Sequence, residues 1–160
     1  MVYVITDCCG AVKIGHTQNM HQRMLTLQMS AHKELIALMT IETGSKNEDR
    51  RLEKALHTHF RTKRIVLQNG HITEWFEDSI FEKISNTDFL SEVFNECRLA
   101  GKPIIHFGLP DAIWGDVVRE RTKRLSNVNL YEETENERVK AFRKSEKAHL
   151  FRSRNITLQT

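Results

Sequence analysis

The alternation of strand and helix patterns over residues 2–75 most constrains the fold, and it begins with a hairpin. Residues 2–6 and 11–14 are short runs rich in Val and Ile, and the four residues between them begin with Asp7 and end with Gly10. β-Branched residues favour strands, and Asp and Gly favour tight turns. The pattern predicts two antiparallel strands that start a sheet.

Two further strand patterns belong to the same sheet. Residues 35–41 are nearly all apolar, which favours a strand inside the sheet over one at a solvent-exposed edge. Residues 65–67 and 72–75 flank Gln-Asn-Gly-His, and Asn-Gly is a strong indicator of a hairpin turn. We therefore expect the sheet to contain a buried strand and a second hairpin.

Two amphipathic helices separate these strand patterns. In the first, Met20, Met24 and Leu27 recur at helical spacing, and Asn19 and Gln22 have the spacing of an N-cap and its N3 partner. The second helix, about residues 46–62, begins with a capping-box pattern and continues with apolar residues four apart. Its residues are Ser45 and Glu48 for the cap, then Leu52, Leu56 and Phe60. The predicted fold is an α+β unit of order β-β-α-β-α-β-β, a central antiparallel sheet flanked by helices.

The chain beyond residue 76 has mainly helical patterns and no chemical motif. Helices are predicted over residues 77–84, 88–99, 117–125 and 132–151, and an ordered loop or short strand over residues 104–114. We place a boundary near residue 86. The chain then has two parts, residues 1–86 and a mainly helical C-terminal region, residues 87–160.

Basic residues are concentrated near the end of the chain. Residues 138–154 contain seven basic residues and one acid, although the net charge of the whole chain is only +3. Two interpretations have equal weight. The segment is either a helix that packs on the rest of the protein with its charges in water, or a nucleic-acid-binding helix. In the second case the phosphate contacts would come from Arg143, Lys144, Lys147, Arg152 and Arg154.

Composition excludes several classes of protein. The chain is 39% apolar and 28% charged, an ordinary mixture for a soluble globular protein, and it has no run of eighteen apolar residues and no signal-peptide pattern. We expect a cytoplasmic protein that does not bind membranes. Its three cysteines, two of them adjacent, indicate neither a disulfide framework nor a zinc site.

Five short motifs follow one another along the first half of the chain. They are Val2-Tyr3-Val4, Val12-Lys13-Ile14-Gly15-His16-Thr17, Arg23, Glu53 to His57 with Phe60, and Glu74-Trp75-Phe76. In type, order and spacing this set resembles the GIY-YIG endonuclease superfamily, and most of all its phage-associated branch with KIG in place of YIG. The resemblance covers about residues 1–76. It implies a GIY-YIG-type fold for residues 1–86 and a location in a bacterial or phage-infected cell.

The resemblance also implies an activity and a catalytic site. The activity is that of a metal-dependent endonuclease or nickase that hydrolyses phosphodiester bonds in nucleic acid, with DNA as the favoured substrate. Glu53 would bind Mg²⁺ or Mn²⁺, which neutralises charge on the phosphoryl oxygens and helps the leaving oxygen. Arg23 would bind two phosphate oxygens through its forked cation. Tyr3 would position or deprotonate the attacking water.

Lys13 and two histidines complete the predicted site. Lys13 stands where the better-studied nucleases have a second tyrosine, and it could contact phosphate or lower the proton affinity of the Tyr3 phenol. His57 lies one helical turn after Glu53 and His16 follows Gly15, so either could carry a proton, and we also place His16 at the nucleic-acid interface. A structural alternative for His57 is packing against Trp75.

The sequence is compatible with three functions. An endonuclease predicts Mg²⁺-dependent cleavage, and a homodimer would let two copies of a single site cut both strands. A non-cleaving nucleic-acid-binding or regulatory module would use the same residues to hold phosphate, and Lys13 supports it because a lysine cannot act as a phenol. A protein-interaction factor would keep the fold without the activity and would use the region after residue 86 to bind a partner protein.

Overall fold

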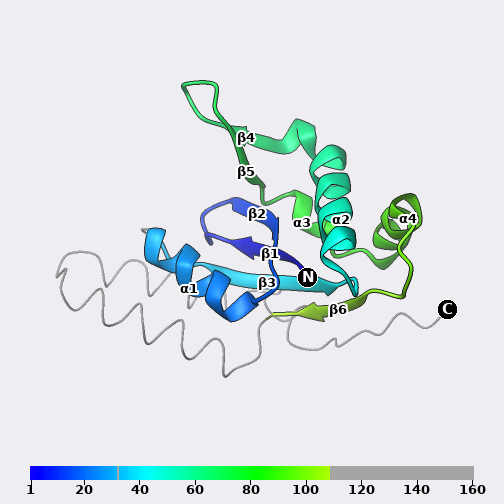
Figure 1. Cartoon of the computed structure of the whole chain (residues 1–160). Helices are drawn as coiled ribbons and strands as arrows, with labels where there is room; N and C mark the ends of the chain where they lie inside the picture. Colours follow the sequence, from blue (N-terminus) through cyan, green and yellow to red (C-terminus); the bar gives the residue numbers. More distant parts are fainter. Residues whose placement is uncertain (32, 109–160) are drawn as a thin grey trace.

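A six-stranded antiparallel sheet organises the part of the chain that the computed structural model describes, residues 1–31 and 33–108 (Figure 1). The strands lie in the order β4-β5-β2-β1-β3-β6, and every neighbouring pair is antiparallel. Their bounds are β1 Val2–Thr6, β2 Ala11–His16, β3 Ile36–Glu42, β4 Arg64–Val66, β5 Ile72–Glu77 and β6 Ile104–Phe107. The predicted fold class is confirmed, including the position of β3 inside the sheet.

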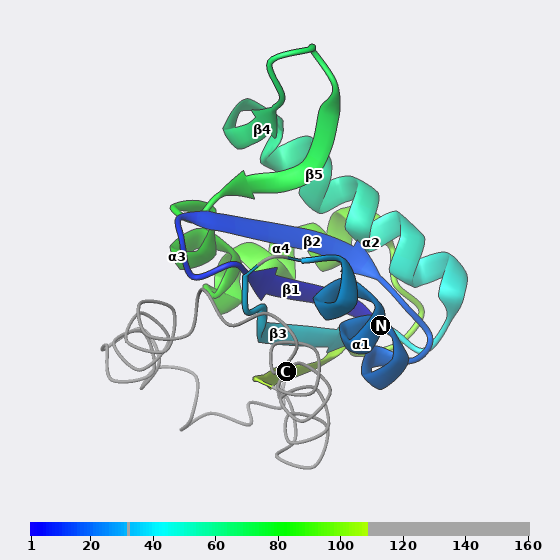
Figure 2. The same cartoon turned by 90° about the vertical axis from the view of Figure 1, so that its left-hand side faces the viewer.

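Helices cover both faces of this sheet (Figure 2). They are α1 Met20–Ser30, α2 Lys46–His59, the short 3-10 helix η1 Arg61–Lys63, α3 Ile80–Ile84 and α4 Thr87–Cys97. Side chains of β1 alternate between the two faces, as the pleat of a strand requires. Val2 and Val4 belong to the core that also contains apolar residues of α2, α3 and α4, whereas Tyr3 and Ile5 pack with apolar residues of α1.

The caps that the sequence predicts begin both long helices. The side chain of Asn19 accepts a hydrogen bond from the backbone N–H of Gln22 at 3.0 Å. At the start of α2, Ser45 accepts from the backbone N–H of Glu48 and donates its hydroxyl to the Glu48 carboxylate. The two bonds donated by backbone N–H groups satisfy donors that have no partner inside the helix, so the two helix starts are specified locally.

Strand pairing explains two of the boundaries that were predicted wrongly. The helix predicted from residue 77 begins only at Ile80, because Glu77 still pairs with Ala11 as the last residue of β5 and the N–H of Asp78 donates to the carbonyl of Gly10. The second strand continues past residue 14 to His16, because Gly15 and His16 pair with the first two residues of β1. In both places the pairing between strands overrides the local pattern.

The core continues across residue 86, where we placed the domain boundary. Leu90 and Val93 of α4 pack with Leu52 and Leu56 of α2, and β6 pairs with β3, which confirms the short strand expected there. The division into two parts stays a prediction. The helices expected at residues 117–125 and 132–151 lie outside the described residues, and so do the basic residues Arg143, Lys144, Lys147, Arg152 and Arg154.

In the described part of the chain, no helix combines the length and the apolar character that spanning a bilayer requires.

Candidate active site

The residues predicted to form the site meet where β5 diverges from β2. β5 pairs with β2 only along residues 11–13, so the last three residues of β2 have β1 as their one strand neighbour among the described strands. α1 lies on one face of the sheet here and α2 on the other (Figure 2). Side chains from both helices therefore reach the same unpaired strand edge.

Tyr3, Gly15 and Arg23 form the first part of this site. Tyr3 and Gly15 pair across β1 and β2, and a Cβ added to Gly15 would lie 2.3 Å from the Tyr3 Oη. Arg23, from α1, donates its Nε–H to the Tyr3 Oη at 2.9 Å. The absence of a side chain at Gly15 makes room for the phenol, and Arg23 fixes the position of its oxygen.

The phenol of Tyr3 is neutral at pH 7. Burial raises the pKa of Tyr3, the hydrogen bond and charge of Arg23 oppose the rise, and the negative charges of Glu74 and Glu53 add to it. A neutral phenol that accepts a bond from Arg23 still has its own proton to donate. The neutral phenol is therefore better suited to positioning a water molecule or a phosphate oxygen than to acting as a base that takes a proton from the water.

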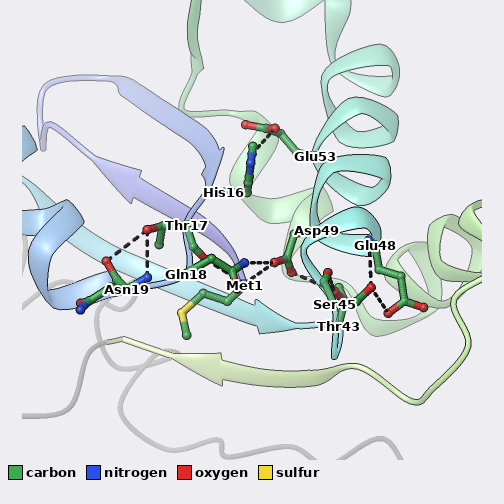
Figure 3. Close-up of polar contacts among 10 residues, drawn as sticks. All are labelled: Met1, His16, Thr17, Gln18, Asn19, Thr43, Ser45, Glu48, Asp49 and Glu53. Atoms are coloured by element: carbon green, nitrogen blue, oxygen red, sulfur yellow. Dashed lines mark hydrogen bonds and ion pairs between the residues drawn. The ribbon is translucent and has the colours of Figure 1, made fainter.

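Glu53 is held at the site by a histidine. Its Oε2 lies 2.6 Å from Nδ1 of His16, which follows Gly15 at the end of β2 (Figure 3). The side chain of Glu53 is 18% exposed. Within the described residues, Oε1 of Glu53 has no hydrogen-bond partner, so one oxygen of a fixed carboxylate can bind a ligand.

His57 lies one turn after Glu53 and contacts the same strand. Its Nε2 donates to the carbonyl of Ile14 at 3.1 Å, and its ring packs edge-on against Phe76, with ring centres 5.1 Å apart. The ring therefore packs against Phe76 and not against Trp75, the partner we expected in the structural alternative. Burial lowers the pKa of His57, although the Ile14 carbonyl and the charge of Glu53 oppose this. A neutral ring that donates through Nε2 leaves Nδ1 able to accept a proton.

Lys13 forms an ion pair across β2 and β5. Its Nζ lies 2.5 Å from Oε2 of Glu74 and 5.8 Å from the ring centre of Trp75, and its side chain is 10% exposed. Partial burial opposes ionisation of Glu74, but the hydrogen bond and charge of Lys13 outweigh it and lower the pKa of Glu74. Lys13 is thus already bound to an anion, although an ammonium has three donors and can accept another partner.

The donor set at Glu53 fits a hard divalent ion held through one carboxylate. The described residues contain no group of three or more His, Cys, Asp and Glu side chains that could bind a metal ion together. Zinc and calcium sites normally require such a set. Mg²⁺ is often held by one or two carboxylates, with water and substrate phosphate as the other ligands. Glu53, with one oxygen unbonded, suits that mode.

Asp49 is a buried acid on α2 that the sequence analysis did not identify. Its Oδ2 accepts hydrogen bonds from the Gln18 side chain at 3.0 Å and from the Met1 amino group at 2.7 Å, and its Oδ1 accepts from the Thr43 hydroxyl at 2.8 Å (Figure 3). These partners come from three separate segments, so no local sequence pattern could indicate them. Asp49 joins the start of α2 to the ends of β2 and β3.

Arg64, at the start of β4, is a second residue that the sequence analysis missed. Its guanidinium carbon lies 5.1 Å from the ring centre of Phe76, and its charge helps to lower the pKa of His57, after the larger effect of burial. Its Nε is buried without a hydrogen-bond partner. Arg64 therefore places an additional positive charge near His57.

Comparison with known proteins identifies one family. The family model of the T5orf172 domain matches residues 1–98, a span that includes every candidate residue from Tyr3 to Glu74 and ends just after α4. This domain is found in phage-associated and GIY-YIG-like nuclease-related proteins. Comparison with curated proteins and with solved structures gives no match.

Proposed function

The chain belongs to the T5orf172 domain family, and from this premise we propose that it is a GIY-YIG-type metal-dependent endonuclease or nickase acting on nucleic acid, with DNA as the preferred substrate. The observation that carries the proposal is the convergence of Tyr3, Arg23 and Glu53 at the unpaired edge of β2. These residues come from a strand and two helices on opposite faces of the sheet. If each of the three residues had only a structural role of its own, nothing would require their side chains to lie at one place.

Each side chain has a distinct task in the proposed reaction. Arg23 uses its Nε to hold Tyr3, which leaves its two terminal nitrogens to bind non-bridging phosphate oxygens. Tyr3 orients the attacking water through the proton that its hydroxyl donates, and Nδ1 of His57 takes a proton from that water. A Mg²⁺ or Mn²⁺ ion at Glu53 would neutralise charge on the phosphoryl group and stabilise the leaving oxygen. His16 keeps the carboxylate of Glu53 in place.

A non-cleaving nucleic-acid-binding module is the second candidate, and the ion pair of Lys13 with Glu74 favours it. This lysine occupies the position at which the resemblance leads one to expect a second phenol, and its charge is already neutralised by Glu74. In a non-cleaving module the positively charged side chains of the site would bind phosphate, but no group would activate a water molecule sufficiently for it to attack the phosphate.

A cleavage assay separates the two candidates. The purified chain is incubated with supercoiled plasmid and with single-stranded DNA and RNA, in Mg²⁺, in Mn²⁺ or with chelator. Metal-dependent cleavage supports the endonuclease. Salt-sensitive binding without cleavage under any metal supports the second candidate, because release of counterions from phosphates makes such binding weaken steeply with salt. Direct linearisation of the plasmid, without a nicked intermediate, would support a homodimer.

A further inference from the structure

One side of α2 carries exposed positive charge next to the candidate site. Lys46, Arg50 and Lys54 are exposed and lie four residues apart, so they share one side of the helix. We call these three residues the α2 basic row. Glu53 and His57 lie on the neighbouring row of the same helix, because helical positions three and four apart are neighbours. Arg61, exposed in η1, extends the positive charge beyond the end of α2.

The acids of the same segment do not neutralise this row. Glu48 is buried and accepts hydrogen bonds from Ser45 and from the backbone N–H of Ala100. Asp49 is buried too, and Glu53 is bound to His16. In the described part of the chain, none of the three residues of the α2 basic row forms an ion pair. Like charges four residues apart repel each other, so an anionic ligand along the row would relieve that repulsion.

Arg64 provides a further positive charge near His57, and its guanidinium group forms no ion pair with a described residue. It lies over the ring of Phe76, and among the described residues it has no carboxylate partner. Its buried Nε has no acceptor. An arginine that is held by an aromatic ring, with no carboxylate bound to its terminal nitrogens, can use those nitrogens to bind a phosphate group.

We propose that the α2 basic row and Arg64 bind the phosphate backbone of the nucleic-acid strand next to the candidate site. The inference rests on the proposed function and deepens it, because it assigns the substrate-binding surface to the helix that also carries Glu53. At a rise of about 1.5 Å per residue, Lys46 and Lys54 are about 12 Å apart along the helix, which is roughly the length of three to four nucleotides at about 3.4 Å each. The row is therefore long enough to follow more than one phosphate.

Binding measurements with matched variants test this inference. Fluorescence anisotropy follows the binding of labelled DNA and RNA, single-stranded and duplex, to the full chain over a range of salt concentrations with chelator present. The row variant carries Lys46→Gln, Arg50→Gln and Lys54→Gln. The control variant carries Lys33→Gln, Lys83→Gln and Arg98→Gln, which removes the same charge from other exposed positions of the described chain. A single Arg64→Gln variant completes the set, and circular dichroism verifies folding.

The row variant should bind at least roughly tenfold more weakly at low salt, with a salt slope reduced by about 2 to 3, because each lost phosphate contact lowers the slope by about 0.9. Arg64→Gln should lower the slope by about 1. The control should keep the wild-type slope. Equal losses in the row and control variants, or an unchanged slope in the row variant, would overturn the inference. Comparing DNA with RNA identifies which backbone is bound.

Cleavage gives a separate readout. A wild-type chain that never cleaves but binds through the α2 basic row would contradict the proposed function and support this inference. A wild-type chain that cleaves, with KM and salt slope unaffected in the row variant, would support the function and overturn the inference.

Discussion

Tyr3 and Gly15 face each other across β1 and β2 so closely that a Cβ at residue 15 would lie 2.3 Å from the Tyr3 hydroxyl oxygen. Real Cβ atoms essentially never come that near to a non-bonded heavy atom, and the backbone of Gly15 has no left-handed conformation that would itself demand glycine. The glycine is therefore required for the space it leaves. That space is what allows a fully buried tyrosine to present its hydroxyl group to Arg23.

Gly15→Ala should both destabilise the fold and disturb the site. We expect a loss of about 1–3 kcal/mol in the free energy of unfolding, because the added methyl group must displace a packed side chain. Cleavage should fall with it, since Oη of Tyr3 has to move. Urea denaturation and a cleavage assay measure the two effects. Gly101→Ala is the control, because nothing lies within 4 Å of a Cβ there. Equal behaviour of the two variants would contradict this explanation of Gly15.

Arg23→Lys should impair catalysis while leaving the fold intact. A lysine has all its donors on one nitrogen and lacks the planar fork of a guanidinium, so it holds the Tyr3 oxygen and two phosphate oxygens together less well, and the single-turnover cleavage rate should fall on the order of a hundredfold. The pKa of Tyr3 should rise further, because the variant loses the Arg23 hydrogen bond that opposes the effect of burial, although it keeps the positive charge. An NMR titration of labelled tyrosine follows this change. Arg98→Lys, at the exposed end of α4, should change neither quantity.

Asp49→Ala should affect stability and not chemistry. The substitution removes a buried carboxylate that accepts three hydrogen bonds, one of them from the positively charged Met1 amino group. The free energy of unfolding should fall by about 2–4 kcal/mol. Well below the melting temperature, the cleavage rate per folded molecule should stay within a few-fold of wild type. A large rate loss in a fully folded variant would indicate that Asp49 belongs to the reacting groups.

Neutral His57 should make stability depend on pH. Its folded pKa lies below the ordinary value of 6.5, so the folded state takes up the proton less readily than the unfolded state. This contribution to stability is present above pH 6.5 and is lost as the pH falls from 6.5 through the folded pKa. His57→Gln, whose amide can still donate to the Ile14 carbonyl, should flatten this part of the profile. Urea denaturation above and below pH 6.5 provides the measurement, and identical profiles would refute the assignment.

Local patterns were sufficient for much of the fold. The capping bonds of Asn19 and Ser45, the apolar spacing along α2 and the turn residues of both hairpins act within a few residues, so the sequence indicates them directly. The end of β5 at Glu77 could not be predicted in this way, because it depends on pairing with Ala11, 66 residues earlier in the chain. Tertiary contacts decide such boundaries.

The candidate site, like the fold, was predictable from the sequence only in part. Tyr3, Arg23 and Glu53 were identified as candidates from the order of the motifs alone, through the family resemblance. Their roles stay predictions until activity is measured. The sequence did not predict two contacts that position side chains of the site: that of His16 with Glu53 and that of Glu74 with Lys13. Each of these contacts joins residues at least 37 positions apart, and only the folded chain brings them together.

The most direct test of the account compares two glutamates, each hydrogen-bonded to a histidine. Glu53 contacts His16 at 2.6 Å at the candidate site, and Glu96 contacts His59 at 2.9 Å on the exposed side of α4. The rate of plasmid cleavage in Mg²⁺ or Mn²⁺ is measured for wild type, Glu53→Gln and Glu96→Gln, with each variant shown to be folded. We predict that Glu53→Gln loses on the order of a hundredfold or more of the wild-type rate, because its amide cannot replace the carboxylate as a metal ligand, and that Glu96→Gln keeps it. Metal-dependent cleavage that survives Glu53→Gln unchanged would contradict the account.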